Sequence, residues 1–318
     1  MSQSLLTIVI PVYNTSEYLS RCIESVVNQT VNNLDIIIIN DGSTDNSEEI
    51  IKKYLLKQPK INYIKLEKNI GVGNARNLGI ENTKTKYISF IDSDDWVDAA
   101  YYENMLLTIE HDKTDICISG IKTEVDDIYN WKYRYKYHSH FIVDSDFCIH
   151  SLTNQYNHDI TISPIVNNKI YKKTLLTDNK IWFDKSRRAQ DLFFSFMVFI
   201  YTNKASVCHN IFYHYYQRSF SATHNFTKLY VDDYFYILQT LKKELNTRGL
   251  YVSYKKEYEC YVIYYMTKLI KNMFNNIQSA NEQKEYIIYI LKKAFDLIAI
   301  EKLVEYVDIE RFKKFWCI

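Results

Sequence analysis

Several features that mark common classes of protein are missing from this chain of 318 residues. Its formal net charge is only +1, so no nucleic acid is expected as a partner. No apolar run approaches the roughly 18 residues that cross a bilayer, and the first residues lack the basic and apolar regions of a secretory signal. The cysteines are scattered without a CxxC pair, which argues against a zinc site and a disulfide framework. We therefore expect a cytoplasmic protein with reduced thiols.

Glycine is also scarce, and its distribution is uneven. The chain has six glycines, and four of them lie between Gly42 and Gly79. A chain with so little glycine keeps it where the backbone turns sharply or approaches a ligand closely. The uneven distribution therefore indicates a binding site in this region before any motif is considered.

The first hundred residues alternate between short apolar runs and amphipathic segments. Strands are expected at residues 5–10, 35–39, 61–66 and 86–92, with helices between them. We expect the first strand to stop at Pro11, because proline cannot continue a central strand. This alternation predicts an α/β fold with a mostly parallel sheet flanked by helices. Ligands of such sheets bind beyond the carboxyl ends of the strands.

The rest of the chain is less regular at first and then helical. Residues 101–225 are rich in aromatic side chains, as expected of a half that faces a substrate. After Tyr230, two apolar stripes recur at helical spacing. They consist of Val231, Tyr234, Leu238, Leu241 and Leu245, and of Tyr258, Tyr261, Val262, Tyr265, Met266, Leu269, Ile270, Met273 and Phe274. The simplest interpretation is packing between helices, while an oligomer contact or a surface that rests on a membrane stays open.

An acidic cluster follows the fourth expected strand, with the sequence Asp92-Ser93-Asp94-Asp95. Carboxylates at a strand end suit a hard divalent cation that bridges phosphate oxygens. Such a cation would neutralise charge on a departing nucleoside diphosphate. The alternative is a solvated acidic turn that caps the next helix.

Polar motifs follow the second and third expected strands as well. Asp41, in Asn-Asp-Gly-Ser, is placed to accept a hydrogen bond from a nucleotide base, unless the motif is merely a turn. The third strand precedes a glycine-lined turn, with Arg76 in the helix after it. This arrangement suits a contact with a base or phosphate. The alternative places Arg76 on a solvated helix face.

Taken together and in order, these motifs resemble the family 2 glycosyltransferases of the GT-A (Rossmann-like) fold. The matching segments are Ile10-Pro11-Val12-Tyr13-Asn14, Asn40-Asp41-Gly42-Ser43, Gly71-Val72-Gly73-Asn74-Ala75-Arg76-Asn77 and Asp92-Ser93-Asp94-Asp95. The resemblance implies an enzyme that transfers a sugar from a nucleotide diphosphate with inversion, and UDP is the nucleotide expected from the family at large. It implies a domain over residues 1–225, with a nucleotide-binding half (1–100) and an acceptor half (101–225), and a helical C-terminal region over 226–318.

The resemblance also assigns roles to residues of the nucleotide-binding half. Pro11, Val12 and Tyr13 would line the base pocket together with Asp41 and Arg76. Asp92 would lie near the ribose, and Ser93 would also contact the nucleotide sugar. Asp94 would hold a Mn²⁺ or Mg²⁺ ion on the diphosphate.

The second half matches the family more loosely. Gln190-Asp191-Leu192-Phe193-Phe194 resembles the family's acidic pair followed by apolar residues, with Gln190 in place of the glutamate. Asp191 would be the catalytic base, because an acceptor hydroxyl becomes a good nucleophile only as its proton is taken. Neighbouring apolar side chains would raise its pKa. The alternative from the residues alone is a helix N-cap.

Further residues follow from the segment that resembles the family's aromatic-arginine-serine motif. Arg218 and Ser221 would contact the diphosphate, and His224 or His214 would complete the metal site. Lys169 and Arg187 or Arg188 would contact acceptor or phosphate, although solvated positions suit them equally well.

The acceptor implied by the resemblance is a hydroxyl of a cell-surface glycan, a teichoic acid, or a lipid-linked or protein-linked oligosaccharide. Peripheral association with the inner face of the membrane and a homo-oligomer through the C-terminal helices are open expectations. The rival from another class is a binding module that kept the fold and lost the chemistry. Asp94 and Asp191 argue against it, because both are present.

Overall fold

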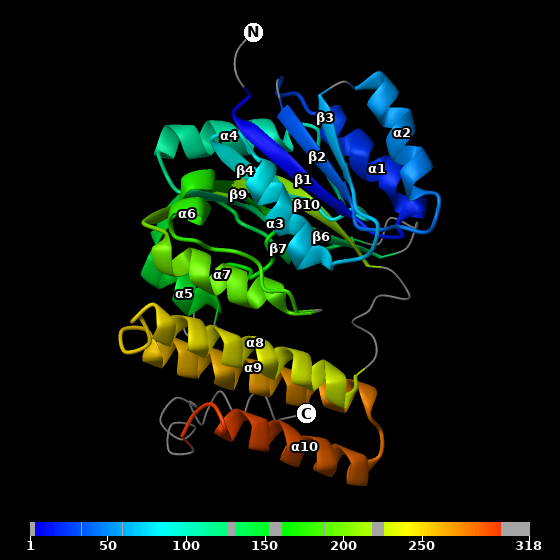
Figure 1. Cartoon of the computed structure of the whole chain (residues 1–318). Helices are drawn as coiled ribbons and strands as arrows, with labels where there is room; N and C mark the ends of the chain where they lie inside the picture. The colour runs from blue at the N-terminus through cyan, green and yellow to red at the C-terminus, as the bar shows by residue number, and fades with distance from the viewer. Residues whose placement is uncertain are drawn as a thin grey trace. The chain divides into compact units, whose positions relative to one another are not determined.

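The computed structural model describes residues 4–32, 34–58, 60–125, 131–152, 161–186, 188–217 and 226–299 (Figure 1). The chain forms two compact units, residues 1–149 with 158–219 and residues 150–157 with 220–318. The expected domain boundary at residue 225 falls within 218–225, which lies outside the described part of the chain.

The first unit begins with the predicted parallel strands. They are β1 (Leu6–Val12), β2 (Leu34–Asn40), β3 (Ile61–Lys65) and β4 (Tyr87–Phe90), and they pair in the order β3-β2-β1-β4. The helices that connect them are α1 (Ser16–Val27), α2 (Ser47–Lys57) and α3 (Val72–Asn82). Buried isoleucines fill β2, as a strand covered on both faces requires. The alternation of strands and helices is therefore confirmed.

Pro11 does not end the first strand, contrary to the sequence-based expectation. It lies inside β1 and pairs with Ile39 of β2. On the other side, the pairing of β1 with β4 stops at Val9 and Phe90. Pro11 therefore stands where β1 has a neighbour on one side only. A missing backbone N–H is tolerated at such an edge position.

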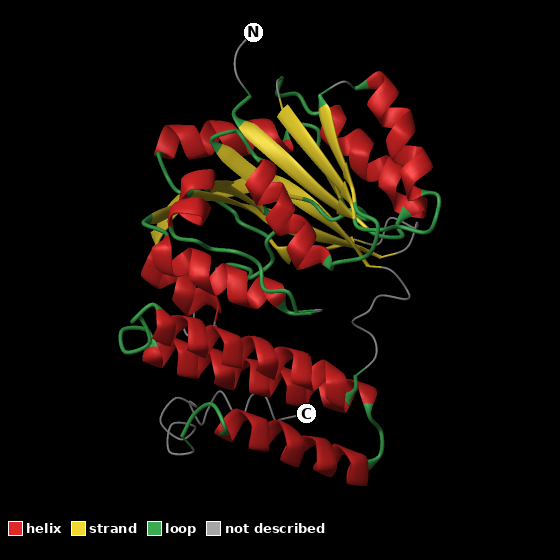
Figure 2. Cartoon of the chain, viewed as in Figure 1, coloured by secondary structure: helices red, strands yellow, loops and turns green. Residues whose placement is uncertain are grey.

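The second half of the sheet adds mainly antiparallel strands (Figure 2). β9 (Lys169–Lys172) pairs antiparallel with β4 and with β6 (Ile116–Val125), and β6 pairs parallel with β10 (Lys204–Gln217). Shorter strands complete the sheet at β10 and β6, namely β5 (Trp96–Val97), β7 (Trp131–Tyr135) and β8 (Phe141–Asp144). The helices of this half are α4 (Tyr101–Asp112), α5 (Ser145–Leu152), α6 (Lys173–Asp178) and α7 (Gln190–Tyr201). The result is a mixed sheet flanked by helices.

Alternate side chains of β1 pack into different layers, as the period of a strand requires. Ile8 and Ile10 share a core with α1 and α4, which contribute Leu19 and Met105. Val9 lies on the opposite face and contacts α3 at Gly79, where an added Cβ would come within 2.4 Å of its Cγ1. The glycine therefore lets α3 pack directly on the strand that leads into the predicted site.

The second unit is helical and consists of α8 (Lys228–Thr247), α9 (Lys255–Asn276) and α10 (Ala280–Phe295). Both predicted stripes are largely buried, and the Tyr258 hydroxyl donates to the Leu238 carbonyl. The packing interpretation is confirmed for these stripes. A partner or membrane contact would have to use other side chains, such as the exposed Leu229 and Tyr236. In the described residues, no helix combines the length and apolar character needed to span a bilayer.

Candidate active site

The carboxyl ends of β1 and β2 lie side by side and are joined by hydrogen bonds. Pro11 and Val12 are buried, whereas Tyr13 is 47% exposed. The next residue, Asn14, has a φ of 50° and receives the Thr44 N–H on its side chain at 2.8 Å. The turn after β1 is therefore fixed to the turn after β2, and the Tyr13 ring is left accessible to a ligand.

Asp41 fixes the glycine-lined turn that precedes α3. Its two carboxylate oxygens accept the backbone N–H groups of Ile70 and Gly71 at 2.7 and 2.9 Å. Burial raises the pKa of Asp41, while these two donors oppose the rise. Gly42 has a φ of 70°, and a Cβ there would lie 2.6 Å from the Lys68 carbonyl carbon. Each oxygen of Asp41 keeps a further lone pair, which can accept a hydrogen bond from a ligand. The contact between Asp41 and a nucleotide base stays a prediction.

The acidic turn after β4 alternates between half-buried and buried side chains. Asp92 and Asp94 are half-buried, whereas Ser93 and Asp95 are buried. Asp95 accepts hydrogen bonds from the Tyr213 hydroxyl and from the Tyr216 N–H. Burial raises the pKa of Asp95 well above its ordinary value, and the nearby Asp94 and Asp92 raise it further. The turn is thus a concentration of negative charge and not a solvated cap.

The residues of this turn fit a divalent cation that is shared with a ligand. Asp92 and Asp94 present hard carboxylate oxygens, which Mg²⁺ and Mn²⁺ prefer. In the described part of the chain, no group of three or more histidine, cysteine or acidic side chains forms a complete metal site. One or two carboxylates, completed by phosphate oxygens and water, are the usual donor set for Mg²⁺.

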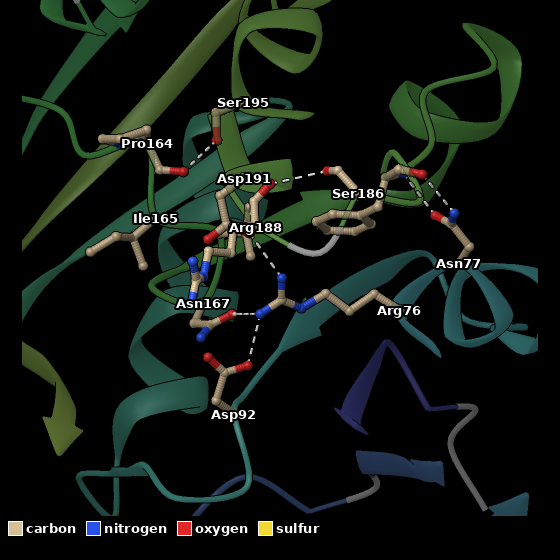
Figure 3. A network of polar contacts seen from close by, with 12 residues as sticks. Arg76, Asn77, Asp92, Pro164, Ile165, Asn167, Ser186, Arg188, Asp191 and Ser195 are labelled. Atoms are coloured by element: carbon tan, nitrogen blue, oxygen red, sulfur yellow. Dashed lines mark hydrogen bonds and ion pairs between the residues drawn. The ribbon is translucent and has the colours of Figure 1, made fainter. Parts of the chain in front are cut away.

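Arg76 joins the acidic turn to α7 (Figure 3). Its Nη2 lies 2.7 Å from Asp92 Oδ1 and 3.4 Å from Asn167 Oδ1, and its Nη1 lies 2.9 Å from Asp191 Oδ1. The Arg76 side chain is only 3% exposed and lies over the Phe183 ring. The solvated-face alternative for Arg76 is therefore wrong. Both amino groups of Arg76 contact carboxylates. A role for Arg76 in the base pocket beside Asp41 stays a prediction.

Asp191 lies in the first turn of α7, in a position fixed by an unusual backbone conformation. The preceding N-cap residue, Ala189, has a φ of 60°, and left-handed conformations of non-glycine residues concentrate at functional sites. The N-cap alternative for Asp191 is wrong, since Ala189 holds that place. Burial raises the pKa of Asp191, while the Arg76 guanidinium opposes the rise. The direction agrees with the expectation for a catalytic base.

Other predicted residues occupy different surroundings. His214 is an unsuitable metal ligand, because its ring nitrogens lie 2.8 Å from Glu124 and 2.9 Å from Asp98. Lys169 is fully buried, so its solvated alternative is wrong. Arg188 is half-buried and supplies a carbonyl to the Ser186 hydroxyl. Arg187, Arg218, Ser221 and His224 lie outside the described residues.

Three residues that were not predicted from the sequence also shape the site. Asn167 contacts Arg76, and the Tyr213 hydroxyl accepts the Asp92 N–H as well as donating to Asp95. Ser195 donates to the Pro164 carbonyl at 2.6 Å. Asn167 and Ser195 stand in no motif, whereas Tyr213 begins the segment that resembles the aromatic-arginine-serine motif. The only available signal for Tyr213 was its place in the aromatic segment, and for Asn167 none existed.

Comparison with known proteins places these features in a family. The sequence model of the family described as glycosyl transferase family 2 matches residues 7–178 of this chain. EpsH of Bacillus subtilis (strain 168) is 29% identical over 272 residues, which cover 83% of this chain and 75% of EpsH. The glycosyltransferase GlyG of Streptococcus pneumoniae is 30% identical over 198 residues, 59% of this chain and 62% of GlyG. The match to GlyA of the same organism spans only 16% of that protein.

The fold has relatives among solved structures. The crystal structure of Staphylococcus aureus TarS 1–349 aligns with a TM-score of 0.71 and 19% identity, covering 93% of this chain and 81% of TarS 1–349. That identity supports the fold alone, a GT-A sheet with helices on both faces. The family match covers more than half of the chain and includes the strand ends and the acidic turn. The chain therefore belongs to glycosyl transferase family 2 and is a glycosyltransferase.

Proposed function

We propose that this enzyme transfers a hexose or N-acetylhexosamine from a UDP-sugar to a hydroxyl group of a cell-surface glycan or teichoic acid. The donor is supported by the solved structures of TarS, which include complexes with UDP and with UDP-GlcNAc. The acceptor class is supported by relatives. GgaB of B. subtilis, a minor teichoic acid biosynthesis protein, is 38% identical over 117 residues, and the chondroitin synthase of Escherichia coli is 34% identical over 134.

The observation that carries the proposal is the pair of carboxylates on Arg76. Asp92 follows a strand of the nucleotide-binding half, and Asp191 begins a helix of the acceptor half. One guanidinium bonds both, at 2.7 and 2.9 Å. A carboxylate that is held beside the donor-binding edge with a raised pKa is the arrangement that proton transfer from an acceptor requires.

The proposed reaction is a single displacement at the anomeric carbon of the sugar. The acceptor oxygen forms a bond to the anomeric carbon of the sugar while the bond from that carbon to the phosphate oxygen breaks. The diphosphate leaves with the bonding electron pair, and Asp191 takes the acceptor proton. A single displacement of this kind inverts the configuration at the anomeric carbon. A divalent cation bound at Asp94 would neutralise the charge on the departing diphosphate.

The proposal extends to where the enzyme works. A UDP-sugar donor and the scattered cysteines suit the cytoplasm. A lipid-linked acceptor would bring the enzyme to the inner face of the membrane.

The test is Asp191→Asn, which nearly preserves the shape of the side chain but cannot accept a proton at neutral pH. Turnover should fall by roughly two to four orders of magnitude, the usual size of a general-base contribution. UDP-sugar binding, measured by thermal shift with Mn²⁺ present, should persist. Asp184→Asn is a matched control, because Asp184 also lies in the acceptor half and accepts the Ser186 N–H. An Asp191→Asn enzyme with more than about a tenth of wild-type turnover would exclude Asp191 as the base.

A further inference from the structure

Lys169 is a buried cation that the proposed reaction does not use. Its side chain is fully inaccessible to solvent, and its Nζ donates to the carbonyls of Ser163 and Ile165 and to Asn168 Oδ1. Burial of an ammonium group costs free energy unless hydrogen bonds compensate for lost water. Here three oxygens provide part of that compensation. The three hydrogen bonds connect the Lys169 side chain to the segment that precedes it in the sequence.

The bonds hold an irregular segment, residues 163–168, which contains no helix or strand. Irregular segments usually lie on the surface, where water satisfies their backbone groups. In this segment, buried side chains donate hydrogen bonds to the backbone carbonyls in place of water. Besides the two carbonyls bound by Lys169, Pro164 accepts from Ser195 at 2.6 Å, and Val166 accepts from the Tyr171 hydroxyl at 3.0 Å.

Two routes lead from this segment to Asp191 (Figure 3). In the first, Asn167 Oδ1 contacts the Arg76 guanidinium at 3.4 Å, and the same guanidinium bonds Asp191. In the second, Ser195 lies about one turn after Asp191 on α7 and binds the segment through Pro164. The partner of Asp191 and the helix that carries it are therefore both attached to the segment.

We infer that Lys169 is a positioning residue for the catalytic base. Its ammonium group fixes residues 163–168, and this segment fixes Arg76 and α7, which together set the place of Asp191. The inference rests on the proposed role of Asp191 as the base. A displacement of about 1 Å in a reacting group can reduce a rate about a hundredfold, so the three bonds of Lys169 matter for turnover.

The test compares Lys169→Met with Lys173→Met. Lys173 also donates to a backbone carbonyl, that of Thr83, and it begins α6. Lys169→Met should lower kcat about ten- to a hundredfold and leave the affinity for UDP unchanged. Lys173→Met should keep kcat within about twofold of the wild type. If Lys169→Met proves too unstable to assay, Ser195→Ala removes the second route alone and should lower kcat by about three- to tenfold.

A double variant separates positioning from general stabilisation. In the Asp191→Asn background, Lys169→Met should cause no further loss of the residual rate, because residues that act as a unit are not additive. An equal loss in both backgrounds, or a wild-type kcat in Lys169→Met and Ser195→Ala, would overturn the inference alone. Full turnover in Asp191→Asn itself would overturn the proposed base and the inference together.

Discussion

The donor side and the acceptor side of the site are built from different kinds of contact. On the donor side, strand ends and short turns bond to one another through backbone groups, as Asp41 does with the N–H groups of Ile70 and Gly71. On the acceptor side, long buried side chains hold an irregular segment, as Lys169 does with the carbonyls of Ser163 and Ile165. The comparison teaches that a donor pocket can be encoded by local motifs, whereas the placement of the base depends on contacts between distant parts of the chain.

Among the substitutions that test this difference between the donor and acceptor sides, the largest effect is expected at the acidic turn. Asp94→Asn should abolish the Mn²⁺-dependent increase in melting temperature with UDP and lower turnover about 10²- to 10³-fold, because a cation on the diphosphate contributes several kcal/mol to the transition state. Asp112→Asn controls for the loss of an acidic side chain far from the turn in sequence. UDP binding that is equal with and without a chelator in the wild type would contradict the predicted metal.

The next effect concerns Arg76, which belongs to both sides. Arg76→Met removes the charge that lowers the pKa of Asp191, so burial alone should raise that pKa further. The base works only when it is ionised. The acidic limb of the pH–activity profile should therefore lie at higher pH in Arg76→Met than in the wild type. We expect kcat/KM to fall about ten- to a hundredfold at neutral pH.

The matched variant is Arg76→Lys. Lysine keeps the positive charge but cannot span two carboxylates with a planar fork. It should lower kcat/KM while shifting the acidic limb of the pH profile less than Arg76→Met does. Identical profiles for the two variants would show that the charge of Arg76 does not control Asp191.

A smaller effect is expected in the framework of the donor side. Gly79→Ala places a methyl group within 2.4 Å of Val9 and should lower the free energy of unfolding by about 1–3 kcal/mol. Denaturant unfolding measures this loss, and a second change, Val9→Ala, should recover part of it by making room. Gly249→Ala is a useful comparison, since no atom lies within 4 Å of its added Cβ, although its φ of 70° adds strain. A Gly79→Ala protein as stable as the wild type would mean that α3 shifts freely on β1.

On the acceptor side, the expected effect is a dependence of stability on pH. Burial lowers the pKa of Lys169 to about 7, although Asp191 opposes this change. A lysine in the unfolded chain keeps its proton to about pH 10, so above pH 7 the unfolded state holds more protons. The free energy of unfolding of the wild type, relative to Lys169→Met, should then rise by up to about 1.4 kcal/mol per pH unit between about pH 7 and 10. Equal slopes for the two proteins in denaturant unfolding would refute this.

The sequence predicted the strands and turns of the donor side, because that information is local. The strands β1 to β4 show as apolar runs, and the polar residues that follow them lie together since parallel strands end at one edge. Pro11 was misjudged because its tolerance depends on where β4 stops, which the sequence of β1 does not contain.

The acceptor side was predicted only in part, and for a physical reason. Asp191 could be found by its resemblance to a family motif. Its contact with Arg76 joins residues 115 positions apart, and that of Arg76 with Asn167 joins residues 91 apart. No period or spacing encodes such pairs. Lys169 is a further case, since a lysine that follows two asparagines looks like a surface position until the fold buries it.

The guanidinium of Arg76 also links the two halves of the site, because it bonds both Asp92 and Asp191. A ligand group that bonds Asp92 Oδ1 would compete with Arg76 for that oxygen and would change how strongly Arg76 holds Asp191. Such a coupling is reciprocal in free energy, so the protonation of Asp191 must change donor affinity by the same factor. If Asp92 contacts the donor and Asp191 is the base, as proposed, the Arg76 bridge would couple occupation of the donor site to the protonation of Asp191.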